Sequence, residues 1–181
     1  MYEGNNPTAL QSKQMIINAM FELLKEESYQ NISIKKLADR AKLSRQTFYA
    51  NFANREEVIR SELDRIFIEY KQAIDKSDNS SNQLIRLFFK FYKSHEQMID
   101  VLLANHLEPL LTEVSRECMD SLQISNEANN QYVYGFVAGG LTQILSDWNR
   151  RNKDLPIEAL ASLTEGLLNP QSFNTTTQEE K

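Results

Sequence analysis

The sequence predicts an all-α protein in which an N-terminal head of three helices is joined by one long helix to a larger helical body. Apolar residues recur at spacings of three and four along most of the 181 residues. Residues that cap helices stand just before several of these segments, and no segment alternates as a β-strand would. We expect a head at 1–55, a body at 56–170 and a disordered tail at 171–181.

The most informative stretch lies between Ile32 and Val58. Ser33 and Ser44 each occupy the position of a helix N-cap before a short segment of apolar residues at helical spacing. Only Lys42 and Leu43 separate the end of the first segment from the second cap. Two short helices joined by so tight a turn form a helix-turn-helix.

Positive charge is concentrated in this stretch, although the protein is acidic. Residues 31–55 contain six basic side chains and one acidic side chain, whereas the whole chain has a net charge of −5. Residues 61–181 contain eleven basic and eighteen acidic side chains, so the body would be repelled by phosphate. The local reversal of sign predicts that the head binds DNA.

Further helices are expected on both sides of the helix-turn-helix. An amphipathic helix from Thr8 to Glu26 precedes it, and a long helix capped by Asn54 follows it to about Lys76. The segment 76–82 is a loop. In the body, the apolar spacing predicts helices over 84–92, 98–103, 109–122 and 132–148, with a last helix from Pro156.

The last two helices are expected to form the interface of a homodimer. Both are apolar over more than one face, and small residues that would let another helix approach closely line the first of them. The alternative is that these helices complete the core of the monomer. The residues expected in a four-helix interface are Gly135, Ala138, Gly139, Thr142, Ser146, Ile157, Leu160 and Leu167.

Several functional classes have no support in the sequence. The single cysteine, Cys118, can form no intramolecular disulfide, and no apolar run approaches the ~20 residues needed to span a bilayer. Without a signal peptide, a cytoplasmic location is expected. His95 and His106 match no common metal-site spacing, and no nucleophile–base pair or phosphate-binding glycine loop is present. We therefore expect no enzyme, no metal and no cofactor.

The chain resembles the TetR/AcrR family of bacterial transcriptional regulators. The resemblance lies in ISIKKLADRAKLS followed by RQTFYANFANREEV, and most specifically in Tyr49 and Phe52 before Arg55. The later string YGFVAGGLTQILSDWNRRNKDLPIEALASLTEGLL is similar to one C-terminal class of the family. The resemblance implies about nine helices, a homodimer, and operator binding that a small ligand often relieves. Residues 76–126 show no match beyond helical character.

The second helix of a helix-turn-helix enters the major groove with its N-terminal residues toward the bases. Here Arg45, Gln46 and Tyr49 would face base edges, because arginine suits guanine and glutamine suits adenine. Lys42 stands where the family usually has glycine, so we expect a positive φ there. The residues expected to contact DNA, by base or by phosphate, are Lys13, Ser33, Lys42, Ser44, Arg45, Gln46, Thr47, Tyr49, Asn51 and Arg55.

A small-molecule effector would bind between helices of the body, and the long helix after Asn54 would transmit its effect to the head. The protein would then be a repressor released from a palindromic operator. Two alternatives remain. One is a regulator, either a repressor or an activator, whose body binds a protein coregulator, and the other is a helical adaptor that does not bind DNA. The residues expected to line the effector site are Phe67, Tyr70, Phe88, Tyr92, Met98, Leu102, His106, Met119, Tyr134 and Trp148.

Overall fold

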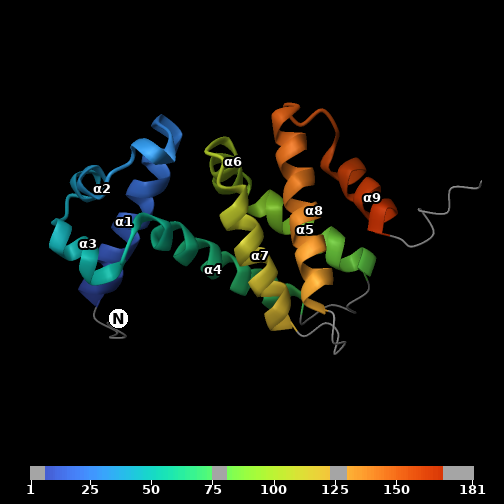
Figure 1. Cartoon of the computed structure of the whole chain (residues 1–181), viewed down its shortest axis with the longest axis horizontal. Coiled ribbons are helices and arrows are strands. Elements are labelled where there is room, and N and C mark those ends of the chain that lie inside the picture. Colours follow the sequence, from blue (N-terminus) through green and yellow to red (C-terminus); the bar gives the residue numbers. More distant parts are fainter. Residues whose placement is uncertain (1–6, 75–80, 123–129, 169–181) are drawn as a thin grey trace, which may run out of the picture.

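The computed structural model describes residues 7–74, 81–122 and 130–168, and over these residues the chain is helical without strands (Figure 1). The predicted all-α fold is confirmed. The predicted tail at 171–181 lies outside the described residues, as does most of the predicted loop at 76–82. The helices are α1 (Pro7–Glu26), α2 (Ile34–Arg40), α3 (Arg45–Asn51), α4 (Arg55–Ile74), α5 (Ser81–Ser94), α6 (Glu96–Ala104), α7 (Glu108–Leu122), α8 (Asn130–Arg150) and α9 (Ile157–Leu168).

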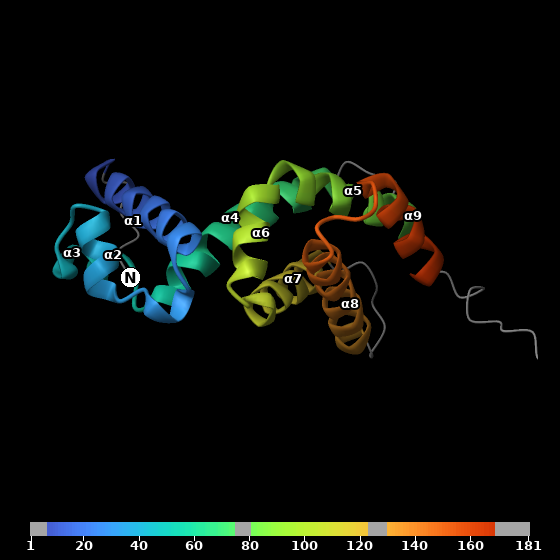
Figure 2. The same cartoon turned by 90° about the horizontal axis from the view of Figure 1, so that it is seen from above.

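Helices α1, α2 and α3 form the head at one end of the molecule, and α5 to α9 form the body (Figures 1 and 2). The head encloses a core in which Met20, Leu37 and Phe48 are fully buried. Helix α4 packs against α1 in the head and against α5 and α7 in the body. Because one continuous helix contributes to both cores, any tilt of α4 moves the head relative to the body.

The turn between α2 and α3 has the conformation that the sequence predicts. Lys42 has a φ of 56°, in the left-handed region, and its N–H donates to the Asp39 carbonyl. The Leu43 N–H donates to the Ala38 carbonyl, which completes a Schellman motif at the end of α2. A lysine in this conformation costs roughly 1 kcal/mol relative to glycine.

Three of the small residues of α8 face the inside of the protomer, whereas Gly139 is half-buried with open space beside its Cα. Helix α8 packs most extensively on α7, and Ala138, Thr142 and Ser146 are buried. The Ser146 hydroxyl donates to Glu108 at the start of α7 over 2.9 Å. Small side chains therefore let α7 approach α8, and these three residues are not available to a second copy of the chain.

Helix α9 packs chiefly on α5, where Leu160 is buried, so this residue of the expected dimer interface is also inside the protomer. Large apolar side chains are instead exposed elsewhere on α8 and α9. The exposed set is Tyr132, Val133, Phe136, Leu163 and Leu167. The expected interface was therefore wrong for Ala138, Thr142, Ser146 and Leu160, while Leu167 does lie on the exposed apolar face.

A joint between head and body forms around Tyr29, which begins a short 3-10 helix after α1 (Tyr29–Asn31). The Tyr29 N–H donates to Oδ1 of Asn105 over 2.8 Å, and the Asn105 amide donates to the Leu24 carbonyl over 2.9 Å. From the start of α4, Arg55 donates to the carbonyls of Tyr29 and Ile32. We call these five residues the Tyr29 joint.

A cluster of charged residues fixes the end of α8 to α5 and α6. Lys153 has a φ of 57° and donates to Asp100 over 2.6 Å and to Glu96. The hydroxyl of Tyr92 donates to Asp100 over 2.6 Å, and Asn149 donates to the same carboxylate. The hydrogen bond from Lys153 is the main cause that lowers the pKa of Glu96 below its ordinary value.

We expect Lys153→Met to destabilise the protein by about 1–2 kcal/mol, because two carboxylates lose a hydrogen-bonded cation in a partly exposed site. A carboxyl whose pKa is lowered by folding adds stability above its unfolded pKa, and this contribution disappears as the pH falls through the folded pKa. Thermal unfolding between pH 3 and pH 6 should therefore show a flatter acid limb in the variant. Lys90→Met, which changes an exposed lysine of α5, is the matched control, and an equal effect there would contradict the prediction.

Candidate nucleic-acid interface

Helix α3 presents a polar face on the outside of the head. Arg45, Gln46 and Tyr49 are exposed on it, whereas Phe48 points into the core. The Tyr49 ring packs edge-on against Phe48 with 5.5 Å between ring centroids, which holds its side chain at the surface. Among the described residues, the side chains of Arg45 and Gln46 have no hydrogen-bond or ion-pair partner, so both are available to an external ligand.

The start of α3 is fixed by its cap. The Ser44 hydroxyl accepts from the Thr47 N–H over 3.0 Å and also contacts the Thr47 hydroxyl. Ser33 caps α2 in the same way, accepting from the Lys36 N–H. Asn51 donates to the Thr47 carbonyl over 2.8 Å. Four of the residues expected to contact DNA thus already shape the helix-turn-helix, and their polar atoms are partly used within the head.

Ion pairs within the head neutralise part of its positive charge. Lys36 pairs with Glu27 at 2.6 Å, and Arg40 pairs with Glu26 at 2.5 Å. Hydrogen bonds from Arg40 lower the pKa of Glu26. These pairs tie α2 to the end of α1. Lys35, Lys42 and Arg45 are exposed without such a pair among the described residues, so accessible positive charge lies on α2, at the turn and at the start of α3.

Two predicted phosphate contacts lie elsewhere than on the face of α3. The Lys13 ammonium lies 5.6 Å from the centre of the Phe52 ring, at the edge of the head. The Arg55 guanidinium points inward, where it binds two carbonyls and lies 4.8 Å from the centre of the Tyr29 ring. The structure therefore gives Arg55 a role in the Tyr29 joint, and its contact with phosphate stays a prediction.

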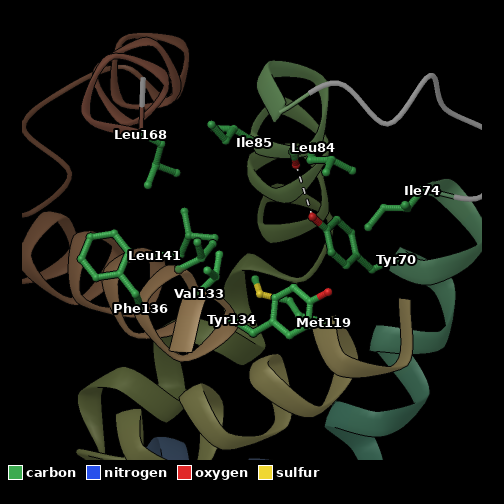
Figure 3. Close-up of a pocket in the computed structure, with 11 residues that line it drawn as sticks. Tyr70, Ile74, Leu84, Ile85, Met119, Val133, Tyr134, Phe136, Leu141 and Leu168 are labelled. Atoms are coloured by element: carbon green, nitrogen blue, oxygen red, sulfur yellow. Dashed lines mark hydrogen bonds between the residues drawn. The ribbon is translucent and has the colours of Figure 1, made fainter. Parts of the chain in front are cut away.

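A second site, of a different kind, lies in the body. A cavity of about 390 Å³ opens among α4, α5, α7, α8 and α9 (Figure 3). Volumes of 300–1,000 Å³ are typical of small-molecule sites. Three candidates for the effector site, Tyr70, Met119 and Tyr134, line this cavity. The remaining lining residues, which the sequence analysis missed, are Ile74, Leu84, Ile85, Val133, Phe136, Val137, Leu141 and Leu168.

The other seven candidates for the effector site do not line this cavity. Phe67 packs on the Phe91 ring, Phe88 packs on Phe89, and Tyr92 packs on Trp148. Leu102 is fully buried, and His106 is exposed in the turn before α7. Met98 faces a groove between α1 and the α5–α6 corner. Aromatic side chains at helical spacing mostly fill the core, and aliphatic ones border the space.

Asn105 has a structural role that the sequence did not indicate. Its partners, Leu24 and Tyr29, are 81 and 76 residues away, so no local spacing indicates the contact. The position of Asn105 between the apolar segments of α6 and α7 was the one local feature that could have indicated this contact. The described residues also contain no group of three or more His, Cys, Asp or Glu side chains that could hold a metal ion. Within the same residues, no helix is both long and apolar enough to cross a membrane.

Residues 16–61 match the model of a family described as bacterial regulatory proteins, tetR family. The whole fold is similar to Lin0861 from Listeria innocua, with a TM-score of 0.77, 16% identity, and 92% of this chain and 94% of that chain covered. It is also similar to FadR from Bacillus subtilis, solved with stearoyl-CoA (TM-score 0.56, 16% identity, 85% and 96% covered). A third similar structure is that of AlkX, a TetR family repressor from Dietzia, with a TM-score of 0.54, 21% identity, and 83% of this chain and 92% of that chain covered. No curated protein matches the chain in sequence.

We expect Arg55→Ala to lower stability by about 2 kcal/mol, because charge-assisted hydrogen bonds to two carbonyls are lost. In a protein of this size, that change lowers Tm by about 4–8 °C. Arg45→Ala is the matched control, and its exposed side chain should leave Tm nearly unchanged. If Arg55→Ala kept the parental Tm and lost only affinity for DNA, the inward role of Arg55 would be wrong.

Proposed function

Since the chain belongs to the TetR family of bacterial regulatory proteins, which are DNA-binding regulators, we propose that it is a homodimeric repressor of transcription. It binds a palindromic operator and is released by a small-molecule effector. The observation that carries this proposal is the exposed face of α3, where Arg45, Gln46 and Tyr49 stand on a rigidly capped helix. AlkX, which shares the fold, is described as a repressor.

The exposed residues divide into two roles on DNA. Arg45 and Gln46 have the donor and acceptor groups that recognise guanine and adenine in the major groove. Lys42 and the Tyr49 hydroxyl lie at the margins of this face and suit phosphate oxygens. With Arg55 engaged in the Tyr29 joint, Lys42 becomes the main candidate for a phosphate contact beside α3.

The second copy in the proposed dimer binds at the exposed apolar face of α8 and α9. This face contains Val133, Phe136, Leu163 and Leu167, all more than 45% exposed. Large apolar side chains gathered on adjoining helices favour burial against another protein surface. Two identical faces related by a two-fold axis would bury these residues and present both α3 helices to one palindrome.

Effector binding would act on DNA through α4. Tyr70 and Ile74, near the end of α4, line the cavity in the body, and Arg55 at its start belongs to the Tyr29 joint. A ligand that displaces the end of α4 therefore also displaces the head. The two heads of a dimer must lie about 34–36 Å apart, or a multiple of this, so a small tilt weakens operator binding.

The proposal is tested by selecting bound sequences from random duplex DNA. We expect a palindrome with half-sites about 10 base pairs apart, or a multiple of one DNA turn. Gln46→Ala should relax preference at one position of each half-site, at a cost of about 1–3 kcal/mol in discrimination. If no sequence is enriched, or if Gln46→Ala leaves the selected sequence unchanged, the proposed reading role is wrong.

The variant Lys42→Gly distinguishes an effect on DNA affinity from an effect on the stability of the protein. Glycine relieves the left-handed strain at this position, so we expect unfolding to become harder by roughly 1 kcal/mol. Loss of the ammonium should weaken binding to all duplexes and reduce the slope of log K against log salt by about 0.9 for each head. A salt titration on specific and random duplexes provides the measurement, and an unchanged slope would exclude a phosphate contact.

We expect Phe136→Glu to convert the dimer into a monomer, because it places a charge at the centre of an apolar interface. Light scattering after size-exclusion chromatography measures the mass directly. Ile68→Glu is the matched control, since Ile68 is 57% exposed on α4, away from α8 and α9. A dimer that survives Phe136→Glu, or a parent protein that is monomeric, would contradict the proposed interface.

A further inference from the structure

We propose that the cavity in the body binds a neutral, largely apolar molecule with a single hydrogen-bonding group, which pairs with the Tyr134 hydroxyl. This inference rests on the proposed function, because it assigns a chemical class to the effector. Its basis is the lining of the cavity, its volume, and one buried hydroxyl that has no partner.

The lining selects against charge. None of the eleven lining residues is Asp, Glu, Lys, Arg or His, and nine of them have hydrocarbon or thioether side chains. An ion transferred into such surroundings loses its hydration without gaining a counter-ion. Glu165 on α9 already forms an ion pair with Arg86 on α5 at 2.7 Å, outside the lining. A carboxylate or an ammonium would therefore bind poorly.

The volume sets the size of the ligand. An apolar cavity of about 150 Å³ accommodates benzene, which has six non-hydrogen atoms. By proportion, the 390 Å³ cavity accommodates about 16 non-hydrogen atoms. The lining residues Val133 and Phe136 lie at one side of the cavity (Figure 3). They are exposed in the protomer, and the second copy in the proposed dimer would cover them.

Tyr134 supplies the polar contact. Its side chain is 7% exposed, and its hydroxyl has no hydrogen-bond partner among the described residues. The other lining tyrosine, Tyr70, is already satisfied, because its hydroxyl donates to the Leu84 carbonyl over 3.2 Å. Figure 3 shows the Tyr134 hydroxyl toward the part of the cavity where Tyr70 and Met119 lie. A buried hydroxyl normally has a partner, and a hydroxyl or carbonyl group of a ligand would provide one.

Matched ten-carbon probes test the class of ligand. We expect 1-decanol, with eleven non-hydrogen atoms, to bind the full-length protein in isothermal titration calorimetry. Decanoate and decylamine, which have the same chain and are charged at pH 7, should bind at least tenfold more weakly. Equal binding of either charged probe, or no binding of 1-decanol, would overturn the proposal.

Two variants test the residues. Tyr134→Phe removes only the hydroxyl, so we expect about three- to tenfold weaker binding of 1-decanol. Its Tm should equal or exceed that of the parent, because no internal hydrogen bond is lost. Tyr132→Phe, two residues away and 73% exposed, is the matched control and should change neither quantity. Val137→Phe fills the cavity and should abolish binding. Unchanged affinity in Tyr134→Phe or in Val137→Phe would overturn the assignment.

The binding assay contains no DNA, so its failure is distinct from failure of the proposed function. A protein that selects a palindrome but does not bind 1-decanol would refute the ligand class alone. A protein that binds 1-decanol through Tyr134 but enriches no duplex would refute the regulatory function alone.

Discussion

The backbone N–H and carbonyl of Tyr29 are both hydrogen-bonded by side chains from other elements, and the position of the head relative to the body depends on these two contacts. Asn105 in the body accepts from its N–H, while Arg55 at the start of α4 donates to its carbonyl. Removing either partner would leave a partly buried backbone group unpaired, which is more costly than the loss of an average hydrogen bond. The joint thereby fixes the head against both the long helix and the corner between α6 and α7. A change in the body that moves α4 or the corner between α6 and α7 would therefore also move α3.

The same constraint explains how an apolar cavity could influence a polar surface on another part of the molecule. The residues that line the cavity are uncharged, but α4 extends from the cavity to the head as one helix and packs in both cores. In the proposed regulation, a ligand that displaces the side chains of Tyr70 and Ile74 would tilt this helix, since close-packed interiors shift rather than compress. The tilt would move Arg55 and hence the capped start of α3. The proposed regulation is mechanical, while the proposed recognition of DNA and of the effector depends on local chemistry.

The local features of the fold were predictable from the sequence, and the long-range ones were not. Serine caps at positions 33 and 44, and the positive φ of Lys42, follow from residues within one turn of each other. The inward turn of Arg55 depends on carbonyls 23 and 26 residues away, and the contact of Asn105 spans a still longer separation. The small residues of α8 predicted that another helix would approach closely, and one does, but it is α7 of the same chain. Eight of the eleven lining residues of the cavity were missed for a similar reason. Seven of those eight are aliphatic, and their spacing is also that of an ordinary core.

The central claim is that a ligand in the body moves the heads through α4 and the Tyr29 joint. The distance between the two heads of the proposed dimer tests this most directly. Spin labels can be attached at Gln11→Cys, an exposed position on α1, in a Cys118→Ser background, and measured by pulsed electron–electron resonance. With 1-decanol bound, the account predicts a shift of a few ångströms in a narrow distribution, and a broadened distribution without a defined shift in Asn105→Ala. An unchanged distance in the parent protein, at a concentration where calorimetry shows the cavity to be filled, would contradict the account.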